Sequence, residues 1–182
     1  MKTPGWIAAN AAGLAIANAS VPAIFRLTWQ AGAADTMIAI WVGLWWGLVI
    51  GGAQVWALRP RRGLLWVLAT MLVLALGWLW TVTLRPTDIL GTATLLSQAR
   101  DAAIFGAAIG AAIGVLQWPG AKPTAPVWIL RSTLGWILAM VALNLGEALV
   151  GPTEGTAHIA MRLGLGAIGG AMLGAVTAMR RG

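Results

Sequence analysis

The chain contains no cysteine and no tyrosine, and charged side chains are scarce: five acids, twelve basic residues and one histidine among 182 residues. Without cysteine there are no disulfides, no thiolate metal sites and no thiol nucleophiles. A single histidine is also too few for a metal site built from helical histidines. Only 9% of the residues are charged, whereas a soluble domain has about 25%. So few charges cannot cover a surface in water, which excludes a soluble globular domain.

Catalytic signatures are missing as well. The sequence has no P-loop, no GxGxxG, no HExxH and no GxSxG, and no Ser/His/Asp set that a membrane topology could gather. We therefore predict a protein that is not an enzyme and has no catalytic residues, no cofactor and no metal. A membrane enzyme is the least favoured alternative. The net charge of +7 is the only sign of nucleic-acid binding, and we expect no nucleic-acid partner.

What the chain does have is long apolar runs. Hydrophobic residues make up 59% of the sequence, and the mean hydropathy is +0.83. We predict an all-α membrane protein, a single polytopic domain over 1–182, whose six transmembrane helices cover about 5–25, 37–58, 63–84, 102–119, 126–149 and 159–179. Residues 85–101 are too polar to span and are expected on the membrane surface. No alternating ten-residue segments indicate a membrane barrel.

The charges sort onto two sides under this six-helix interpretation. One side receives most of the basic residues: Lys2, Arg59, Arg61, Arg62, Lys122, Arg131, Arg180 and Arg181. The other receives all five acids and four arginines: Asp35, Asp88, Asp101, Glu147, Glu154, Arg26, Arg85, Arg100 and Arg162. The positive-inside rule then predicts a cell (inner) membrane protein with both termini in the cytoplasm. The first twenty residues resemble a signal peptide, with Ala-Asn-Ala before Ser20, but they belong to the repeat described next.

The stretch "GLWWGLVIGGAQ" at residues 43–54 is one copy of a repeat. Its glycines and the following amide recur 63 and then 60 residues later, the last position changing to threonine: Gly43, Gly47, Gly51, Gln54; Gly106, Gly110, Gly114, Gln117; Gly166, Gly170, Gly174, Thr177. A second pattern pairs a tryptophan with a small polar residue four positions later: Trp6 and Asn10, Trp66 and Thr70, Trp128 and Ser132. Three copies of a two-helix unit predict a pseudo-threefold bundle.

Glycines spaced by four lie on one helix face and let two backbones approach closely in lipid. We therefore assign all nine repeated glycines to helix packing, with a hinge as the alternative. The six polar residues (Asn10, Gln54, Thr70, Gln117, Ser132 and Thr177) enter from the same side at similar depth. They form either interhelical hydrogen bonds or a polar vestibule for a small solute. Spacing does not decide between the two.

Ionisable residues inside the membrane segments are few. Glu147 near the end of the fifth segment and Arg162 near the start of the sixth are expected to pair across a short loop, with a proton or cation site as the sharper alternative. Five of the twelve tryptophans fit an interfacial belt on the cytoplasmic side: Trp6, Trp56, Trp66, Trp118 and Trp128. The deeper tryptophans suit core packing or an aromatic ligand cage.

Two stretches resemble a known family: "GLVIGGAQVWALR" at 47–59 and "GAAIGVLQW" at 110–118. The chain resembles uncharacterised bacterial multipass membrane proteins with repeated glycine-zipper plus Gln-Trp helices (GxxxGxxxGxxQ). The third copy departs, with Thr177 in place of Gln and no tryptophan. The resemblance implies a membrane topology and no catalytic activity.

Three functions follow in order of preference. The first is a non-enzymatic accessory or scaffold subunit, or a protein that binds a lipid-like ligand. The second is a small-solute transporter or its substrate-binding membrane component. The third is an enzyme. The expected partners are membrane lipids, together with a membrane protein or a second copy of the chain.

Overall fold

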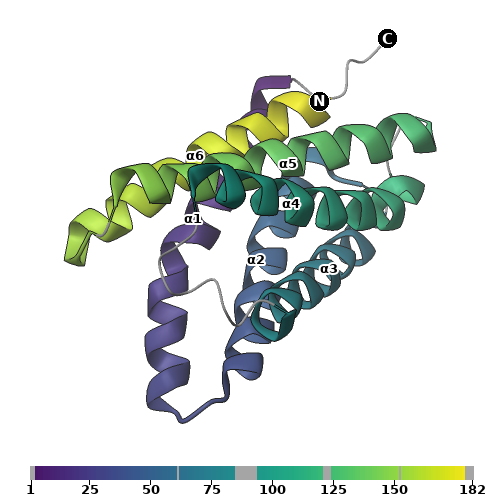
Figure 1. Cartoon of the computed structure of the whole chain (residues 1–182). Coiled ribbons are helices and arrows are strands. Elements are labelled where there is room, and N and C mark those ends of the chain that lie inside the picture. The colour runs from purple at the N-terminus through teal and green to yellow at the C-terminus, as the bar shows by residue number, and fades with distance from the viewer. Residues whose placement is uncertain (1–2, 61, 85–93, 121–123, 152, 179–182) are drawn as a thin grey trace.

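The structure is a computed structural model that describes residues 3–60, 62–84, 94–120, 124–151 and 153–178. These residues form six long helices (Figure 1): α1 (Thr3–Gln30), α2 (Asp35–Leu58), α3 (Gly63–Leu84), α4 (Leu95–Gln117), α5 (Ala125–Val150) and α6 (Gly155–Thr177). A short 3-10 turn, η2 (Trp118–Gly120), follows α4. All six helices are long and apolar enough to cross a membrane. This confirms the prediction of six apolar spans and indicates a multipass membrane protein.

Several helices are longer than hydropathy alone predicts. Helix α1 covers Thr3–Gln30 rather than about 5–25, and α4 begins at Leu95 rather than at 102. The polar residues 95–101 are helical because Thr94 caps α4, its side chain accepting a hydrogen bond from the backbone N–H of Ser97 at 3.2 Å. The expected surface segment 85–101 is corrected from Leu95 onward, and residues 85–93 lie outside the described part.

The helices form a ring in which the closest pairs are α2–α3, α4–α5 and α6–α1. Helices α4 and α5 run side by side in Figure 1. The pairs α1–α2 and α5–α6 are in looser contact, and α3–α4 has far the least contact of the neighbouring pairs. Each closest pair thus joins an even-numbered helix to the odd-numbered helix that follows it around the ring.

A sequence difference accounts for the weak α3–α4 contact. Gly13 of α1 and Gly135 of α5 allow α2 and α6 to approach: a Cβ at Gly13 would lie 3.1 Å from the Cβ of Ala53, and one at Gly135 would lie 2.8 Å from Cδ1 of Leu173. The corresponding residue of α3, at the same spacing from the repeated tryptophan, is Val73. Its branched side chain prevents an equally close approach of α4.

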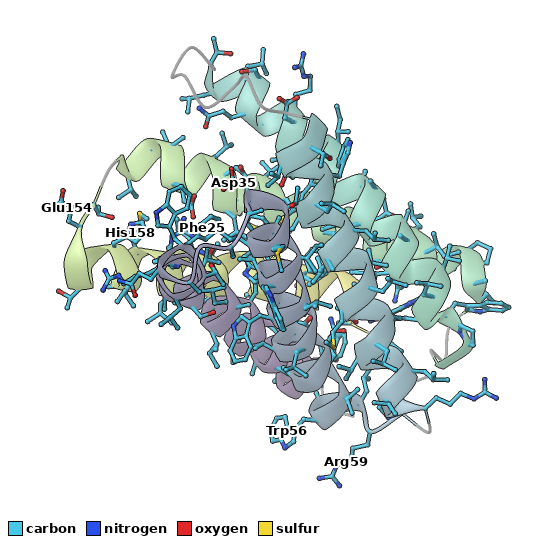
Figure 2. The ribbon with its side chains drawn as sticks, turned by 90° about the horizontal axis from the view of Figure 1, so that it is seen from below. Phe25, Asp35, Trp56, Arg59, Glu154 and His158 are labelled. Carbon is cyan, nitrogen blue, oxygen red and sulfur yellow. The ribbon has the colours of Figure 1, made fainter. Side chains whose placement is uncertain are left out.

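The charged residues separate the molecule into two ends. We call the end with Arg59, Arg62 and Arg131 the basic end, and the end with Asp35, Glu147 and Glu154 the acidic end. Figure 2 shows Trp56 and Arg59 together at one end, and Phe25, Asp35, Glu154 and His158 at the other. The first turns of α1 and the last turn of α6 meet at the basic end, where Trp6 contacts Thr177.

Candidate functional site

The nine repeated glycines all face the backbone of a neighbouring helix. Each even-numbered helix thus carries a stripe of three glycines. The glycine stripe of α2 lies against Ala75, Met71 and Val67 of α3. The stripe of α4 lies against Ile137, Thr133 and Ile129 of α5, and the stripe of α6 lies against Ala15, Ala11 and Ile7 of α1. A Cβ at Gly106 would lie 2.6 Å from the carbonyl oxygen of Trp136, and one at Gly166 would lie 2.6 Å from Cα of Ala15. Cβ atoms do not tolerate such distances, so these contacts require glycine.

The six polar residues of the predicted layer are buried together at the basic end, each at most 4% exposed. Gln54 lies at the centre of their hydrogen bonds. Its Nε2 donates to Oδ1 of Asn10 at 2.9 Å, and its Oε1 accepts from Nε1 of Trp66 at 2.8 Å and from Nε2 of Gln117 at 3.3 Å. Gln117 Nε2 also donates to Oγ1 of Thr70 at 2.9 Å. The structure therefore brings α1, α2, α3 and α4 together through side-chain amides.

The two remaining members of the layer, Thr177 and Ser132, differ in their hydrogen bonds. Oγ1 of Thr177 accepts from Nε1 of Trp6 at 2.9 Å and donates to the carbonyl of Leu173 at 2.6 Å. Ser132 is buried, but it makes no side-chain hydrogen bond among the described residues. Nε1 of Trp128 is also buried and has no hydrogen-bond partner among the described residues. Two of the three repeated tryptophans, Trp6 and Trp66, thus donate to a residue of the layer, and Trp128 does not.

The repeated tryptophans close this layer on the basic side. Trp6, Trp66 and Trp128 form a buried cluster, with the rings of Trp66 and Trp128 5.7 Å apart between centroids. Their assignment to an interfacial belt is wrong, because each is at most 3% exposed. Trp56 and Trp118 do lie on the surface, at 74% and 45% exposed. Trp66 bonds the amide of Gln54 and Trp6 bonds the hydroxyl of Thr177, while all three rings cover the polar layer.

A cavity of about 490 Å³ lies at the acidic end, and residues from all six helices line it. We call it the acidic-end cavity. Its walls are largely apolar, and every helix also contributes a side chain with a polar group. The lining residues are Asn18, Val21 and Phe25 of α1, Trp46 of α2, Trp78 and Thr81 of α3, Gln98, Asp101, Ala102 and Phe105 of α4, Met140, Leu143, Asn144 and Glu147 of α5, and Arg162 of α6. Its volume lies within the range of about 300–1,000 Å³ of small-molecule sites.

Arg162 joins three helices at this cavity. Its NH2 contacts Oε1 of Glu147 at 3.3 Å, so the expected pair is formed. Its NH1 donates to Oδ1 of Asn18 at 3.2 Å, and its Nε donates to Nε2 of His158 at 3.0 Å. Because arginine can only donate, Nε2 of His158 must accept, so the neutral ring carries its proton on Nδ1 and donates it to Oγ1 of Thr153, 3.1 Å away.

Two donors at the cavity wall lack partners. Trp46 and Trp78 pack edge to face, with ring centroids 5.5 Å apart. The Nε1 atoms of both are buried, and neither finds a hydrogen-bond partner within the described ranges. Buried donors are nearly always paired in native proteins. Two unpaired indole N–H groups beside a cavity therefore suit a ligand or water that accepts from them.

Asn18 is not among the predicted site residues, whereas Trp46 and Trp78 are two of the deeper tryptophans expected to serve in core packing or in an aromatic ligand cage. Asn18 lies within the Ala-Asn-Ala stretch that resembles a cleavage signal, and the two tryptophans stand outside the repeated Trp-polar pattern. The signal that could have found Asn18 is its amide deep in an apolar run, where a polar side chain needs a partner. Among the described residues, no group of three or more histidine, aspartate and glutamate side chains is placed to hold a metal.

Comparison with known proteins found no match: no family model, no curated protein and no solved structure matches this chain. The resemblance to uncharacterised bacterial multipass proteins therefore stays a prediction from the repeated motifs.

Proposed function

We propose that this chain is a non-enzymatic integral membrane protein that binds a lipid-like molecule in the acidic-end cavity. The observation that carries the proposal is the cavity itself, a largely apolar space of about 490 Å³ at which two indole donors have no hydrogen-bond partner among the described residues. Small-molecule sites typically combine apolar walls with a few polar groups that orient the ligand. Helices from every part of the chain would hold the molecule.

In this proposal the polar layer at the basic end holds the helices together by interhelical hydrogen bonds. All six residues are buried, and the side chains of Asn10, Gln54, Gln117 and Thr70 form a chain of hydrogen bonds across four helices. A cluster of three tryptophans covers the layer. The cavity lining includes none of the six. A solute path through the layer would have to break these bonds, so the structure favours ligand binding at the acidic end over transport through the layer.

The proposed arrangement is a pseudo-threefold bundle of three two-helix units, with the basic end in the cytoplasm and the acidic end outside. Its support is the correspondence of the three closest pairs, in which a glycine stripe meets the next unit's first helix each time. The positive-inside rule supports the orientation. The cavity then opens in the outer half of the cell (inner) membrane, where outer-leaflet lipids and extracytoplasmic molecules reach it.

Native mass spectrometry of the protein extracted in mild detergent tests ligand binding. We expect a bound lipid-like molecule that is lost in Asn144→Trp, because this side chain lines the cavity and its only side-chain hydrogen bond within the described part goes to the carbonyl of Met140 on its own helix. The matched control is Leu138→Trp, on the exposed apolar face of the same helix. If both variants retain or both lose the molecule, the cavity is not its site.

Thiol labelling separates this proposal from transport, since the native chain has no cysteine. Asn144→Cys at the cavity should react with a small water-soluble methanethiosulfonate, whereas Gln54→Cys in the closed layer should resist it. The reverse pattern would mean that water reaches the layer and would favour the transport hypothesis.

A further inference from the structure

Oxygen acceptors gather on one wall of the acidic-end cavity. Asn144 and Glu147 are three residues apart on α5 and so lie on one helix face. The Nδ2 of Asn144 donates to the carbonyl of Met140, which leaves its Oδ1 without a partner within the described part of the chain. Glu147 uses Oε1 for Arg162, and its Oε2 accepts no hydrogen bond from any described residue. This wall can receive a ligand that donates hydrogen bonds.

The positively charged group of the lining, the guanidinium of Arg162, already has hydrogen-bond and ionic partners. Among the described residues, Arg162 is the one basic residue of the lining, and its Nε, NH1 and NH2 are engaged by His158, Asn18 and Glu147 respectively. The described residues of the lining include two carboxylates, those of Glu147 and Asp101; Asp101 also pairs with Arg100, which is not among the lining residues. An anionic ligand would have to displace existing partners of Arg162, whereas a cation meets carboxylates. The charge balance therefore favours a positively charged group.

Aromatic rings complete the environment that a cation needs. Phe25, Trp46, Trp78 and Phe105 come from four different helices and line the same space. A cation over an aromatic face is attracted by the ring, and the attraction is stronger when the cation is removed from water. A charged group on Glu147 in this cavity would be surrounded by such rings.

The apolar part of a ligand would extend from the cavity between α3 and α4. Helices α3 and α4 have the least contact of any neighbouring pair, and they supply six of the cavity residues, among them Trp78 and Phe105. Trp80 of α3 stacks on Phe105 of α4 at 6.1 Å between ring centroids, so the two helices meet here through side chains and not through close backbone contact. An alkyl chain can leave the cavity here toward the bilayer while the head stays on α5.

We propose that the acidic-end cavity binds a long-chain alkylammonium amphiphile, whose N–H groups donate to Glu147 Oε2 and Asn144 Oδ1 and whose chain runs between α3 and α4. This inference rests on the proposed function and adds the chemical class of the ligand. The indole N–H groups of Trp46 and Trp78 further accommodate an oxygen near the head, such as a hydroxyl.

The test compares four twelve-carbon probes on the full chain in lipid nanodiscs: dodecylammonium, dodecyltrimethylammonium, dodecyl sulfate and dodecyl maltoside. Binding is taken as the amount retained above that of the Asn144→Trp variant, which corrects for partition into the lipid. We expect dodecylammonium to bind most tightly, the trimethyl probe more weakly because it cannot donate, and the sulfate least. A diazirine-bearing alkylammonium should label peptides of α3 and α4.

Glu147→Gln identifies the charged contact, and Glu154→Gln, an exposed acid at the same end outside the lining, is its matched control. A hydrogen bond to a charged group contributes about 1.5–3 kcal/mol, so Glu147→Gln should weaken dodecylammonium binding about tenfold or more and leave dodecyl maltoside unchanged. If the single variant does not fold, Glu147→Gln with Arg162→Gln removes both charges of the pair and should show the same loss.

The outcomes separate the two proposals. Cavity-dependent binding of the maltoside or the sulfate at or above the level of the ammonium would overturn the ligand class and leave the proposed function standing. Equal binding of every probe to the native chain and to Asn144→Trp would overturn both.

Discussion

Nε2 of Gln54 donates to Oδ1 of Asn10 at 2.9 Å, and this single bond connects α2 to α1 in the buried layer at the basic end. Asn10 is fixed in turn, because its Nδ2 donates to the carbonyl of Trp6 one turn earlier. The same glutamine also reaches Trp66 and Gln117. One amide therefore couples four helices, and such hydrogen bonds matter in a membrane because the hydrophobic effect does little to hold helices together in lipid.

Gln54→Leu should lower the stability of the bundle by about 2 kcal/mol, since three interhelical hydrogen bonds at about 0.6 kcal/mol each are lost. Ser132→Ala is the matched control, because Ser132 is equally buried but makes no side-chain hydrogen bond within the described part. Unfolding in mixed micelles with increasing dodecyl sulfate measures both. Equal stability of the two variants would show that the layer contributes nothing to helix association.

Gly47 and Gly52 of α2 give a second contrast. A Cβ at Gly47 would collide with Cα of Met71 on α3, whereas one at Gly52 meets nothing within 4 Å. Gly47→Ala should therefore separate α2 from α3 and destabilise the fold, and Gly110→Leu should do so more severely at the α4–α5 contact. Gly52→Ala should be neutral or stabilise by about 0.5–1 kcal/mol, because alanine favours the helix. Thermal unfolding monitored by circular dichroism ranks the three; normal assembly of Gly110→Leu would refute the packing role.

Trp66→Phe and Trp128→Phe separate hydrogen bonding from burial. The two rings belong to one cluster and touch each other, so each variant loses similar contact area. Trp66 also loses its bond to Oε1 of Gln54, while the indole nitrogen of Trp128 has no partner among the described residues. Trp66→Phe should be the more destabilising, by about 0.6 to 1.7 kcal/mol. The same unfolding measurement in mixed micelles checks the order, which a purely apolar role for both rings would abolish.

The helices and their contact faces could be predicted from sequence because both follow from local pattern. An apolar run of about twenty residues indicates a span, and glycines at every fourth position indicate a contact face. Which helix each glycine face packs against does not follow from local pattern. Gly47 could equally have met its own unit's first helix, and the choice of α3 depends on how three units close into a ring.

The acidic-end cavity could not be predicted because no repeat marks it. Trp46 and Trp78 stand outside the repeated motifs, and Asp101 lies in a stretch whose polarity hid the start of α4. Composition also misplaced Trp6, Trp66 and Trp128, because an interfacial tryptophan and a tryptophan that covers a buried amide occupy the same position along a helix. Burial depends on neighbours that only the assembled bundle supplies.

The orientation of the bundle can be tested at two matched positions. Ala34 and Thr124 precede α2 and α5, lie at opposite ends of the molecule, are exposed, and make no side-chain capping bond. Cysteine at either position should leave the fold unchanged. In right-side-out membrane vesicles, a membrane-impermeant maleimide should label Ala34→Cys and should reach Thr124→Cys only after the membrane is opened, because the proposed orientation puts the basic end in the cytoplasm. Labelling of Thr124→Cys alone would invert the orientation and place the cavity in the cytoplasmic leaflet; an alkylammonium ligand would then have to come from the inside of the cell.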